Sequence, residues 1–382
     1  MQFGLTEEQQ SIKEAAHRLA QEQFAPRAAE IDESGEFPWE NVRRLCESGF
    51  LGMAFPEEYG GGGADHVSHV VVKEEIARAC LSTCTIMAAQ YLGAMPLLLV
   101  GTPEQKEKYL PRLAAGEILA AFGLTEPGAG SDASQIITTA HREGDGYVIN
   151  GGKCFVTNGG VADFYVVFAK TDREAGTRGI SAFIVEKGVP GFSFGKEENK
   201  MGIRASATRE LIFENCRVSV ENRLGEEGMG YKLALRTLDY TRPGVGAEAV
   251  GVSQAALDAS IKYATERTVF GGPLTEKQAI AFMLADMATE IEAARMLVYR
   301  VAALMDDGAA RFTLEASQAK LFASEMARRV VHQAVQIHGG YGYMKEFPVE
   351  RYYRDQRITE LYEGTSEIQR IVIAGSLLRA CH

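Results

Sequence analysis

The sequence "GYVINGGKCFVTNGG", residues 146–160, combines β-branched and aromatic residues with glycine and asparagine, which favour tight turns. Four further runs of the same kind follow it: "DFYVVFAKT" (163–171), "GISAFIVEK" (179–187), "FSFGKE" (192–197) and "RELIFENCRV" (209–218). Short strands separated by Gly, Asn and Asp turns are typical of an antiparallel sandwich or barrel. We therefore predict a central β domain over residues 118–225.

The segments on both sides of this region have helical periodicity instead. "TEEQQSIKEAAHRLAQEQF" (6–24) spaces its apolar residues three and four apart behind a Thr6 cap. Long amphipathic segments after residue 226 suit a bundle, among them "KQAIAFMLADMATEIEAARMLVYRVAALM" (277–305). The predicted fold is α+β and multidomain: an N-terminal α-helical domain (1–117), a central antiparallel β-barrel or sandwich (118–225) and a C-terminal four-helix bundle (226–382).

Composition excludes several classes of partner. A net charge of −11 argues against nucleic acid and against an anionic membrane surface. The stretch from Cys80 to Pro103 has no charged residue, which raises a transmembrane interpretation. Because Ser82, Gln90 and Pro96 interrupt it, we expect a buried helix beside a cavity and no membrane association.

The N-terminal sequence and the cysteines bear on location and metals. Glu7 and Glu8 interrupt "MQFGLTEEQQ", so it is not a secretory signal, and we expect a bacterial-type cytoplasmic protein. An organelle matrix is the alternative if a transit peptide has been removed. The six cysteines are dispersed, and no Cys or His pair completes a metal set, so we expect reduced thiols and no metal.

Several motifs have a structural and a functional interpretation when each is taken alone. "GAGSDA" (128–133) fits the dinucleotide fingerprint, but the strand-like "SQIITTA" follows it where a helix is needed. A glycine-rich loop that lets a phosphate approach its amides remains open. "FVTNGG" (155–160) suits a hairpin turn, "DYTRP" (239–243) a helix cap, and "QIHGGYGY" (336–343) a glycine stop at a helix end.

Glu363 raises the same question. It lies in "TELYEGTSEIQRIV" (359–372), between a tyrosine and a glycine, with small hydroxyl residues behind it. It is either a polar residue in a turn between two helices or a catalytic base.

Taken together, these motifs resemble a known family. The resemblance spans essentially the whole chain and rests on eight segments in order: "LTEPGAGSD", "FVTNGG", "MGIRAS", "TRPGVGAEAVG", "YATERTVFGGPL", "QIHGGYGY", "RYYRD" and "LYEGTSEIQR". They are similar to the acyl-CoA dehydrogenases, and most of all to the short- and medium-chain branch. This resemblance implies FAD-dependent α,β-dehydrogenation of an acyl-CoA to the 2-enoyl-CoA, as in fatty acid β-oxidation. It also implies electron transfer to an electron-transferring flavoprotein and a homotetramer built as a dimer of dimers.

The resemblance assigns FAD contacts residue by residue. The segments matching those around the isoalloxazine ring contain Phe122, Leu124, Thr125, Gly130, Ser131, Phe155, Val156 and Thr157. Phe155 stands where many relatives have tryptophan. The residues matching those that hold the pyrophosphate and adenosine of a neighbouring subunit's FAD are Arg267, Phe270, Gln278, Gln336, Ile337, Gly339 and Gly340. Thr365, Ser366 and Glu367 match further FAD contacts.

The resemblance also assigns substrate contacts and the base. Positions that match CoA thioester contacts are Ser131, Asp239, Tyr240, Thr241, Arg242 and Gly364, and the run around Cys84 and Ala88 would line the acyl pocket. Glu363 would remove the α-proton while a hydride leaves the β-carbon. Its backbone N–H and a ribityl hydroxyl of FAD would polarise the thioester carbonyl. One branch of the family has its base at the position of Thr241, and threonine cannot serve.

Three other functions share features with this sequence. An acyl-CoA oxidase shares the fold but is usually longer, and a non-catalytic scaffold would not need Glu363, Arg242 and the FAD segments. A dehydrogenase of an unusual cyclic, aromatic or dicarboxylic acyl-CoA stays open.

The acyl pocket itself is predicted from helix faces. Cys84, Thr85, Ala88 and Leu92 recur on one face, and Glu248 interrupts the apolar run "PGVGAEAVG" opposite them. The first interpretation is that Glu248 pairs with an arginine inside the bundle. The second is that it borders the pocket and disfavours acyl groups ending in a carboxylate. Both lead to an uncharged short- to medium-chain acyl group, or a compact ring of similar volume.

Overall fold

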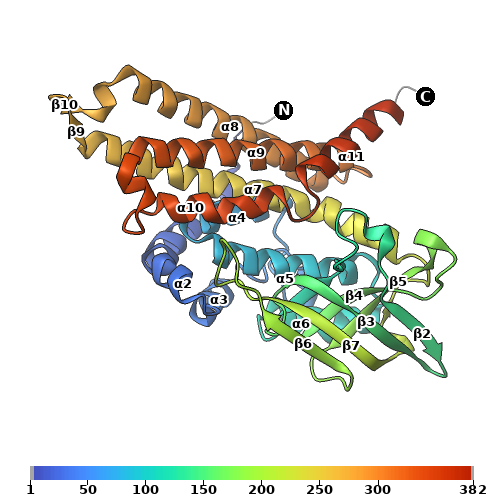
Figure 1. Ribbon diagram of the computed structural model, residues 1–382. Helices are drawn as coiled ribbons and strands as arrows, with labels where there is room; N and C mark the ends of the chain where they lie inside the picture. Colours follow the sequence, from blue (N-terminus) through green and yellow to red (C-terminus); the bar gives the residue numbers. More distant parts are fainter. Residues whose placement is uncertain (1–3, 380–382) are drawn as a thin grey trace.

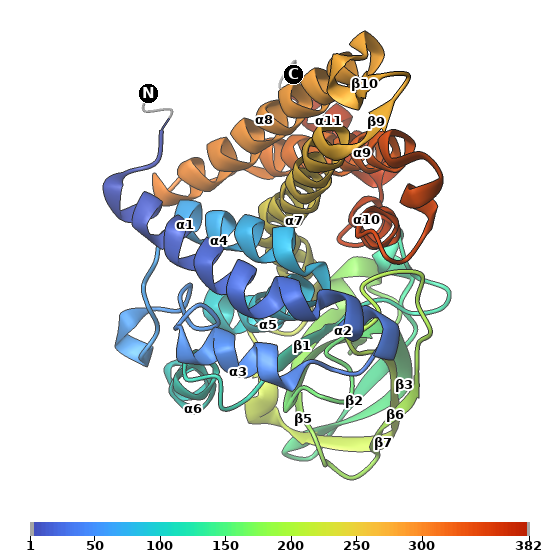
Figure 2. The ribbon, with the colours of Figure 1, turned by 90° about the vertical axis from the view of Figure 1, so that its left-hand side faces the viewer.

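The computed structural model describes residues 4–379. The group of long C-terminal helices lies on one side of a β-sheet, and helix α5 lies between that group and the sheet (Figures 1 and 2). The other N-terminal helices lie beside α5. The N-terminal helices are α1 (Glu7–Leu19), α2 (Ala28–Ser34), α3 (Trp39–Glu47), α4 (His66–Ala79), α5 (Leu81–Val100) and α6 (Pro103–Ala114). The predicted Thr6 cap is confirmed, because its side chain accepts a hydrogen bond from the Gln9 N–H in a capping box.

Helix α5 is the charge-free stretch of the sequence. Among the described residues it is the one helix long and apolar enough to cross a membrane, and 72% of its apolar window is buried inside the protein. Such burial is typical of a core helix. The expectation of a buried helix beside a cavity is confirmed, since Thr85, Ala88 and Leu92 of α5 line a cleft.

The central region forms one eight-stranded sheet. Its strands are β1 (Ala120–Gly123), β2 (Thr139–Glu143), β3 (Gly146–Thr157), β4 (Phe164–Lys170), β5 (Ile180–Glu186), β6 (Phe192–Glu197), β7 (Thr208–Ser219) and β8 (Arg223–Leu224). The order is β6-β7-β3-β2-β4-β5-β8, with β1 beside β4. Most pairs are antiparallel as predicted, but β1 and β2 both pair parallel with β4, so the sheet is mixed.

A bulge in β3 and the glycine-rich loop after β1 shape the site. The register of β3 against β7 shifts between Lys153 and Val156, and Phe155 there has a positive φ of 57°. A bulge of this kind re-aims the side chain on it, and the Phe155 ring is 67% exposed. The "GAGSDA" segment leads only into a single 3-10 turn, Ala133–Gln135, so the helix that a dinucleotide fingerprint needs is not formed there.

The C-terminal helices are α7 (Gly230–Glu266), α8 (Gln278–Asp306), α9 (Thr313–His338), α10 (Val349–Gln356) and α11 (Ser366–Arg379). A short β9–β10 ribbon (Thr268–Val269 and Gly272–Pro273) connects α7 to α8. Helices α7, α8 and α9 pack side by side, α10 packs on α9, and α4 lies against both α7 and α8 (Figure 2). The N-terminal part of the chain thus takes part in the bundle core.

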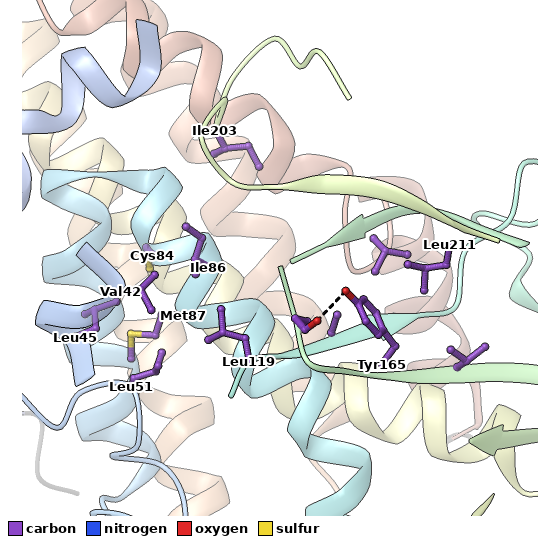
Figure 3. Close-up of a cluster of buried hydrophobic side chains, with 14 of the residues drawn as sticks. Val42, Leu45, Leu51, Cys84, Ile86, Met87, Leu119, Tyr165, Ile203 and Leu211 are labelled. Carbon is purple, nitrogen blue, oxygen red and sulfur yellow. Dashed lines mark hydrogen bonds between the residues drawn. The ribbon is translucent and has the colours of Figure 1, made fainter. Parts of the chain in front are cut away.

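Of the three large hydrophobic cores among the described residues, two hold the helices in place relative to one another and to the sheet. One extends from the N-terminal helices to the sheet, and Leu45, Met87, Leu119 and Tyr165 are all buried in it (Figure 3). The Tyr165 hydroxyl donates to the Ala162 carbonyl at 3.0 Å, which satisfies this buried polar group. The other core joins α4 to α7, α8 and α9. Helices α4 and α5 contribute to these cores on several sides, which fixes them relative to α7.

Candidate active site

A cleft of about 200 Å³ opens where α5, the sheet, α7 and the turn before α11 meet. Helix α5 contributes Thr85, Ala88, Ala89 and Leu92, and α7 contributes Tyr231, Leu235, Leu238, Arg242 and Glu248. The turn contributes Tyr362, Glu363 and Gly364. Segments distant in the sequence therefore meet around Glu363, and the sheet supplies the remaining wall.

The turn that carries Glu363 is held by its carbonyl groups. Glu363 and Gly364 both have a positive φ, 52° and 97°. The Glu363 carbonyl accepts from Arg242 Nε at 3.2 Å and from Gln369 Nε2 at 3.2 Å. The Gly364 carbonyl accepts from Lys320 Nζ at 2.7 Å and from Gln369 Nε2 at 2.9 Å. Side chains from three helices thus stabilise a backbone conformation that a non-glycine residue rarely adopts.

The Glu363 side chain is placed for base chemistry. Its Oε2 accepts a hydrogen bond from Thr241 Oγ1 at 2.6 Å. Burial raises the pKa of this carboxyl above its ordinary value, although Thr241, Lys73 and Arg242 oppose the rise. A carboxylate with a raised pKa binds a proton more strongly than one in water. Within the described part of the chain, the Glu363 backbone N–H has no hydrogen-bond acceptor, so it can donate to a ligand in the cleft.

Most residues predicted to surround the isoalloxazine ring lie on one wall of this cleft. They are Phe122, Leu124, Thr125, Gly130, Ser131, Phe155 and Thr157. Val156 is buried in the sheet instead, because neighbouring strand residues face opposite sides.

These residues fit a flavin. Phe155 offers an exposed ring, and a Cβ built on Gly128 or Gly130 would meet no atom within 4 Å, so the loop leaves open space beside its backbone. Thr125 and Thr157 supply hydroxyls in the same wall. Ser366 Oγ is buried without a hydrogen-bond partner in the described chain, which leaves a donor for a ligand beside Thr365 and Glu367 at the start of α11. A planar aromatic ring with a polar edge suits this wall.

The residues predicted to hold the pyrophosphate and adenosine are elsewhere. Arg267, Ile337, Gly339 and Gly340 line a second groove of about 470 Å³ at the far end of α7. Phe270 in the adjacent ribbon is 99% exposed, and Gln278 and Gln336 are exposed nearby. A helix rises 1.5 Å per residue, so Arg242 and Arg267 lie about 40 Å apart along α7. The two groups of one chain do not meet.

The predicted substrate residues are divided between the cleft and its support. Arg242 lines the cleft, and its Nη1 pairs with Asp239 Oδ1 at 2.8 Å. Asp239 also accepts from Thr313 Oγ1 at 2.7 Å. Ala88 lies in the wall as expected, and Gly364 lies beside Glu363.

The assignment of Cys84 to the cleft wall is wrong, and Tyr240, which is predicted to contact the CoA thioester, does not line the cleft. Cys84 is fully buried, and its Sγ donates to the Lys73 carbonyl at 3.3 Å, because α5 turns that side chain toward α4 and α7 (Figure 3). Tyr240 points away from the cleft face of α7, and its ring packs edge-on against Phe312 with centroids 5.0 Å apart. Both residues support the site from behind.

Glu248 does border the cleft, as the second interpretation predicts. The expected pairing with an arginine is wrong. Its Oε2 accepts from the Tyr362 hydroxyl, and Cys84 Sγ lies 3.9 Å from its Oε1. Burial raises the pKa of Glu248 to about 7, and the nearby ammonium of Lys73 opposes this rise.

Sequence reasoning missed four residues that shape the site: Lys73, Lys320, Tyr362 and Gln369. Lys73 and Lys320 are both fully buried. The signal that could have indicated Lys73 is its place in the run "HVVVKEEIA", directly after three valines. In the described residues no group of three or more His, Cys, Asp or Glu side chains could hold a metal ion.

Comparison with known proteins identifies the family. Models of the three acyl-CoA dehydrogenase domains match in order: the N-terminal domain over residues 6–117, the middle domain over 121–216 and the C-terminal domain over 228–378. A short-chain specific acyl-CoA dehydrogenase of Clostridium acetobutylicum is 50% identical over 380 residues, covering 99% of this chain and 100% of that protein. The mitochondrial short-chain specific enzyme of Mus musculus is 49% identical over 98% of this chain and 91% of its own.

Solved structures agree with this result. Butyryl-CoA dehydrogenase from Megasphaera elsdenii matches with a TM-score of 0.97 at 47% identity, over 99% of this chain and 100% of that chain. A chain from a study of the electron transferring flavoprotein of Acidaminococcus fermentans gives a TM-score of 0.97 at 50% identity, with the same coverage. An acyl-CoA dehydrogenase from Bacillus anthracis complexed with FAD gives 0.92 at 39% identity, over 99% of this chain and 67% of that chain. With three family models and full-length relatives in agreement, this chain belongs to the acyl-CoA dehydrogenase family.

Proposed function

We propose that this FAD-dependent acyl-CoA dehydrogenase oxidises an uncharged short- to medium-chain acyl-CoA, with Glu363 as the base that removes the α-proton. One observation carries the proposal: Glu363 lines the same cleft as the flavin-matching residues, and its carboxylate accepts a hydrogen bond from Thr241. FAD, when bound, supplies the acceptor for the β-hydride.

The chain's own groups prepare the α-proton for removal. The α-carbon of a thioester is weakly acidic, so negative charge that develops on the carbonyl oxygen needs hydrogen bonds. The Glu363 backbone N–H can donate one, because residues 4–379 offer it no acceptor and its turn is held through carbonyl groups. The abstracted proton then resides on a Glu363 carboxylate oxygen. Apolar side chains of α5 exclude water, which strengthens both interactions.

The walls of the cleft support a short or compact acyl group. Thr85, Ala88 and Leu92 form an uncharged wall, and Glu248 with Tyr362 closes the cleft on the α7 side. A carboxylate at the end of the acyl chain would meet Glu248, so dicarboxylic thioesters are disfavoured. The short-chain and butyryl-CoA enzymes among the relatives support the same size class.

A panel of CoA thioesters tests the substrate. The rate of anaerobic flavin reduction and the relative kcat/KM are measured for butyryl-, octanoyl-, cyclohexanecarboxyl-, palmitoyl- and glutaryl-CoA. We expect one of the first three to be best. Palmitoyl- or glutaryl-CoA as the best substrate would contradict the assignment of the acyl cleft.

Glu363→Gln tests the base in the same assay. The amide keeps the shape and the backbone N–H but removes the basic oxygen, so flavin reduction should fall about 10²- to 10⁴-fold while FAD and thioester still bind. Glu174→Gln, an exposed carboxylate in the loop after β4 and outside the cleft, is the matched control and should reduce at the wild-type rate. Equal rates in wild type and Glu363→Gln would show that another group is the base.

The partner and assembly are proposed as well. An electron-transferring flavoprotein is the expected acceptor, supported by the relative studied with that protein. Peroxide released as fast as dye-coupled turnover would instead identify an oxidase. We expect the protein to be a homotetramer and to act in fatty acid β-oxidation. Its expected location is a bacterial-type cytoplasm, and an organelle matrix is the alternative. Sedimentation of the FAD-loaded protein measures the assembly, and a monomer would contradict it.

A further inference from the structure

Lys73 of α4 is buried directly behind the two carboxylates of the cleft. Its side chain is 1% exposed, and it faces α7 so closely that a Cβ built on Gly244 would lie 2.3 Å from Nζ. Gly244 lies three residues after Thr241 and four before Glu248, so these positions share one face of the helix. The ammonium therefore lies against α7 at Gly244, about one helical turn from both Thr241 and Glu248.

The Lys73 ammonium forms no direct ion pair in the described chain. No carboxylate oxygen in the described chain lies within 4.0 Å of Lys73 Nζ. The neighbouring carboxylates of α4 face elsewhere, because Glu74 pairs with Arg295 and Glu75 with Arg78. A buried charge needs a compensating charge nearby, and Glu248 and Glu363 are the two anions that interact with this one.

The remaining titratable groups do not take over this role. Burial lowers the pKa of His69 well below its ordinary value, so that ring is neutral. Burial raises the pKa values of Tyr91, Cys84 and Tyr362, so these groups are neutral too. Two further cations lie near Glu363: Arg242 of α7, which pairs with Asp239, and Lys320 of α9. His66 of α4 is paired with Asp306.

We propose that Lys73 is a positioning residue of the dehydrogenation reaction, whose buried ammonium stabilises the anionic form of the base Glu363 from behind the cleft. It touches no substrate atom in this role. Glu248 shares the same cation, and two interacting carboxylates in one cleft lose their protons in separate steps. The inference rests on the proposed function of Glu363.

The experiment is the pH profile of anaerobic flavin reduction, with the FAD-loaded enzyme and the best thioester of the panel. In Lys73→Met the acidic limb should move to higher pH by about one unit, which is a tenfold loss of rate on that limb. The alkaline plateau should keep the wild-type rate, which a merely structural lesion would not do. Lys262→Met, on an exposed part of α7, is the control and should leave the profile unchanged.

Two further variants keep the test decisive. Glu248→Gln removes a like charge near Glu363 and keeps Lys73, so the acidic limb should not move to higher pH. Lys73→Met/Glu248→Gln removes both charges and should show the upward shift even if the single Lys73 variant does not fold. An unmoved acidic limb in the Lys73 variants, or an equal shift in Glu248→Gln alone, would overturn the proposal. A Glu363→Gln variant that keeps the wild-type rate would overturn the proposed function instead.

Discussion

Thr241 Oγ1 donates at 2.6 Å to the carboxylate that we propose as the base, and this contact gives a prediction at the scale of one residue. The hydrogen bond favours the ionised form of Glu363 and opposes the rise of its pKa that burial causes. In Thr241→Val the bond is lost and the folded-state pKa rises further. The fraction of ionised base at acidic pH then falls, so flavin reduction should be slowed below the new pKa and unchanged well above it.

A matched control lies one turn earlier on the same helix. Thr237 is buried, and its Oγ1 has no hydrogen-bond partner in the described chain. Thr237→Val should therefore leave the pH profile of flavin reduction in place. If both valine variants shift the profile equally, the hydrogen bond to Glu363 is not the cause.

At the scale of elements, a buried ion pair joins the glycine-rich loop to β3. Lys153 Nζ donates to Glu126 Oε1 at 2.6 Å, and the two side chains are 0% and 3% exposed. Glu126 also accepts from the backbone N–H groups of Ile137 and Thr138, and Lys153 donates to the Leu124 carbonyl. This pair holds both ends of the loop whose residues Thr125 and Gly130 line the flavin wall.

Breaking this pair should be costly. Lys153→Met leaves the Glu126 carboxylate buried without its cation, and the free energy of unfolding should fall by about 3–5 kcal/mol. FAD should also be lost more readily on dilution, because the loop is released. Arg217→Met is the matched control: it breaks an ion pair with Glu143 whose side chains are 57% and 63% exposed, and should cost less than about 1 kcal/mol. Urea unfolding of both variants gives the comparison, and similar losses would contradict it.

At the scale of the whole molecule, the FAD-matching residues of one chain lie at opposite ends of α7. The proposal that follows is an FAD contacted by two subunits, with the Glu363 cleft from one and Arg267 from the other. Complementation tests it. Arg267→Glu should lose FAD, and Glu363→Gln should keep FAD without reducing it. Each variant alone is inactive.

Hybrids of these two variants are informative. Co-expressed in one cell with different tags, they should form dimers in which one site combines an intact cleft with an intact Arg267. Dual-tag purified hybrids should then regain flavin reduction by butyryl-CoA. If FAD is bound within a single chain, every chain carries a lesion and no activity returns.

Much of the architecture could be predicted from sequence because its patterns are local. Period-two runs separated by turns place the strands, and three- and four-residue spacing places the helices. The parallel pairing of β1 and β2 with β4 could not be predicted in this way, since a strand's sequence does not report the direction of its neighbour. The participation of α4 in the bundle could not be predicted either, since a helix's sequence does not report which distant helices it packs against.

The sequence by itself indicated the family through the resemblance of its eight motifs, pointed to Glu363 as the proposed base, and predicted a glycine-rich loop without a Rossmann helix. Only the tertiary structure decided that Cys84 faces away from the cleft and that Glu248 bonds Tyr362 and faces Lys73 where an arginine was expected. The physical reason is that sequence spacing shows only which residues share one face of a helix. Which neighbour that face meets depends on how α4, α5 and α7 pack together, and this packing joins residues that are far apart in the chain.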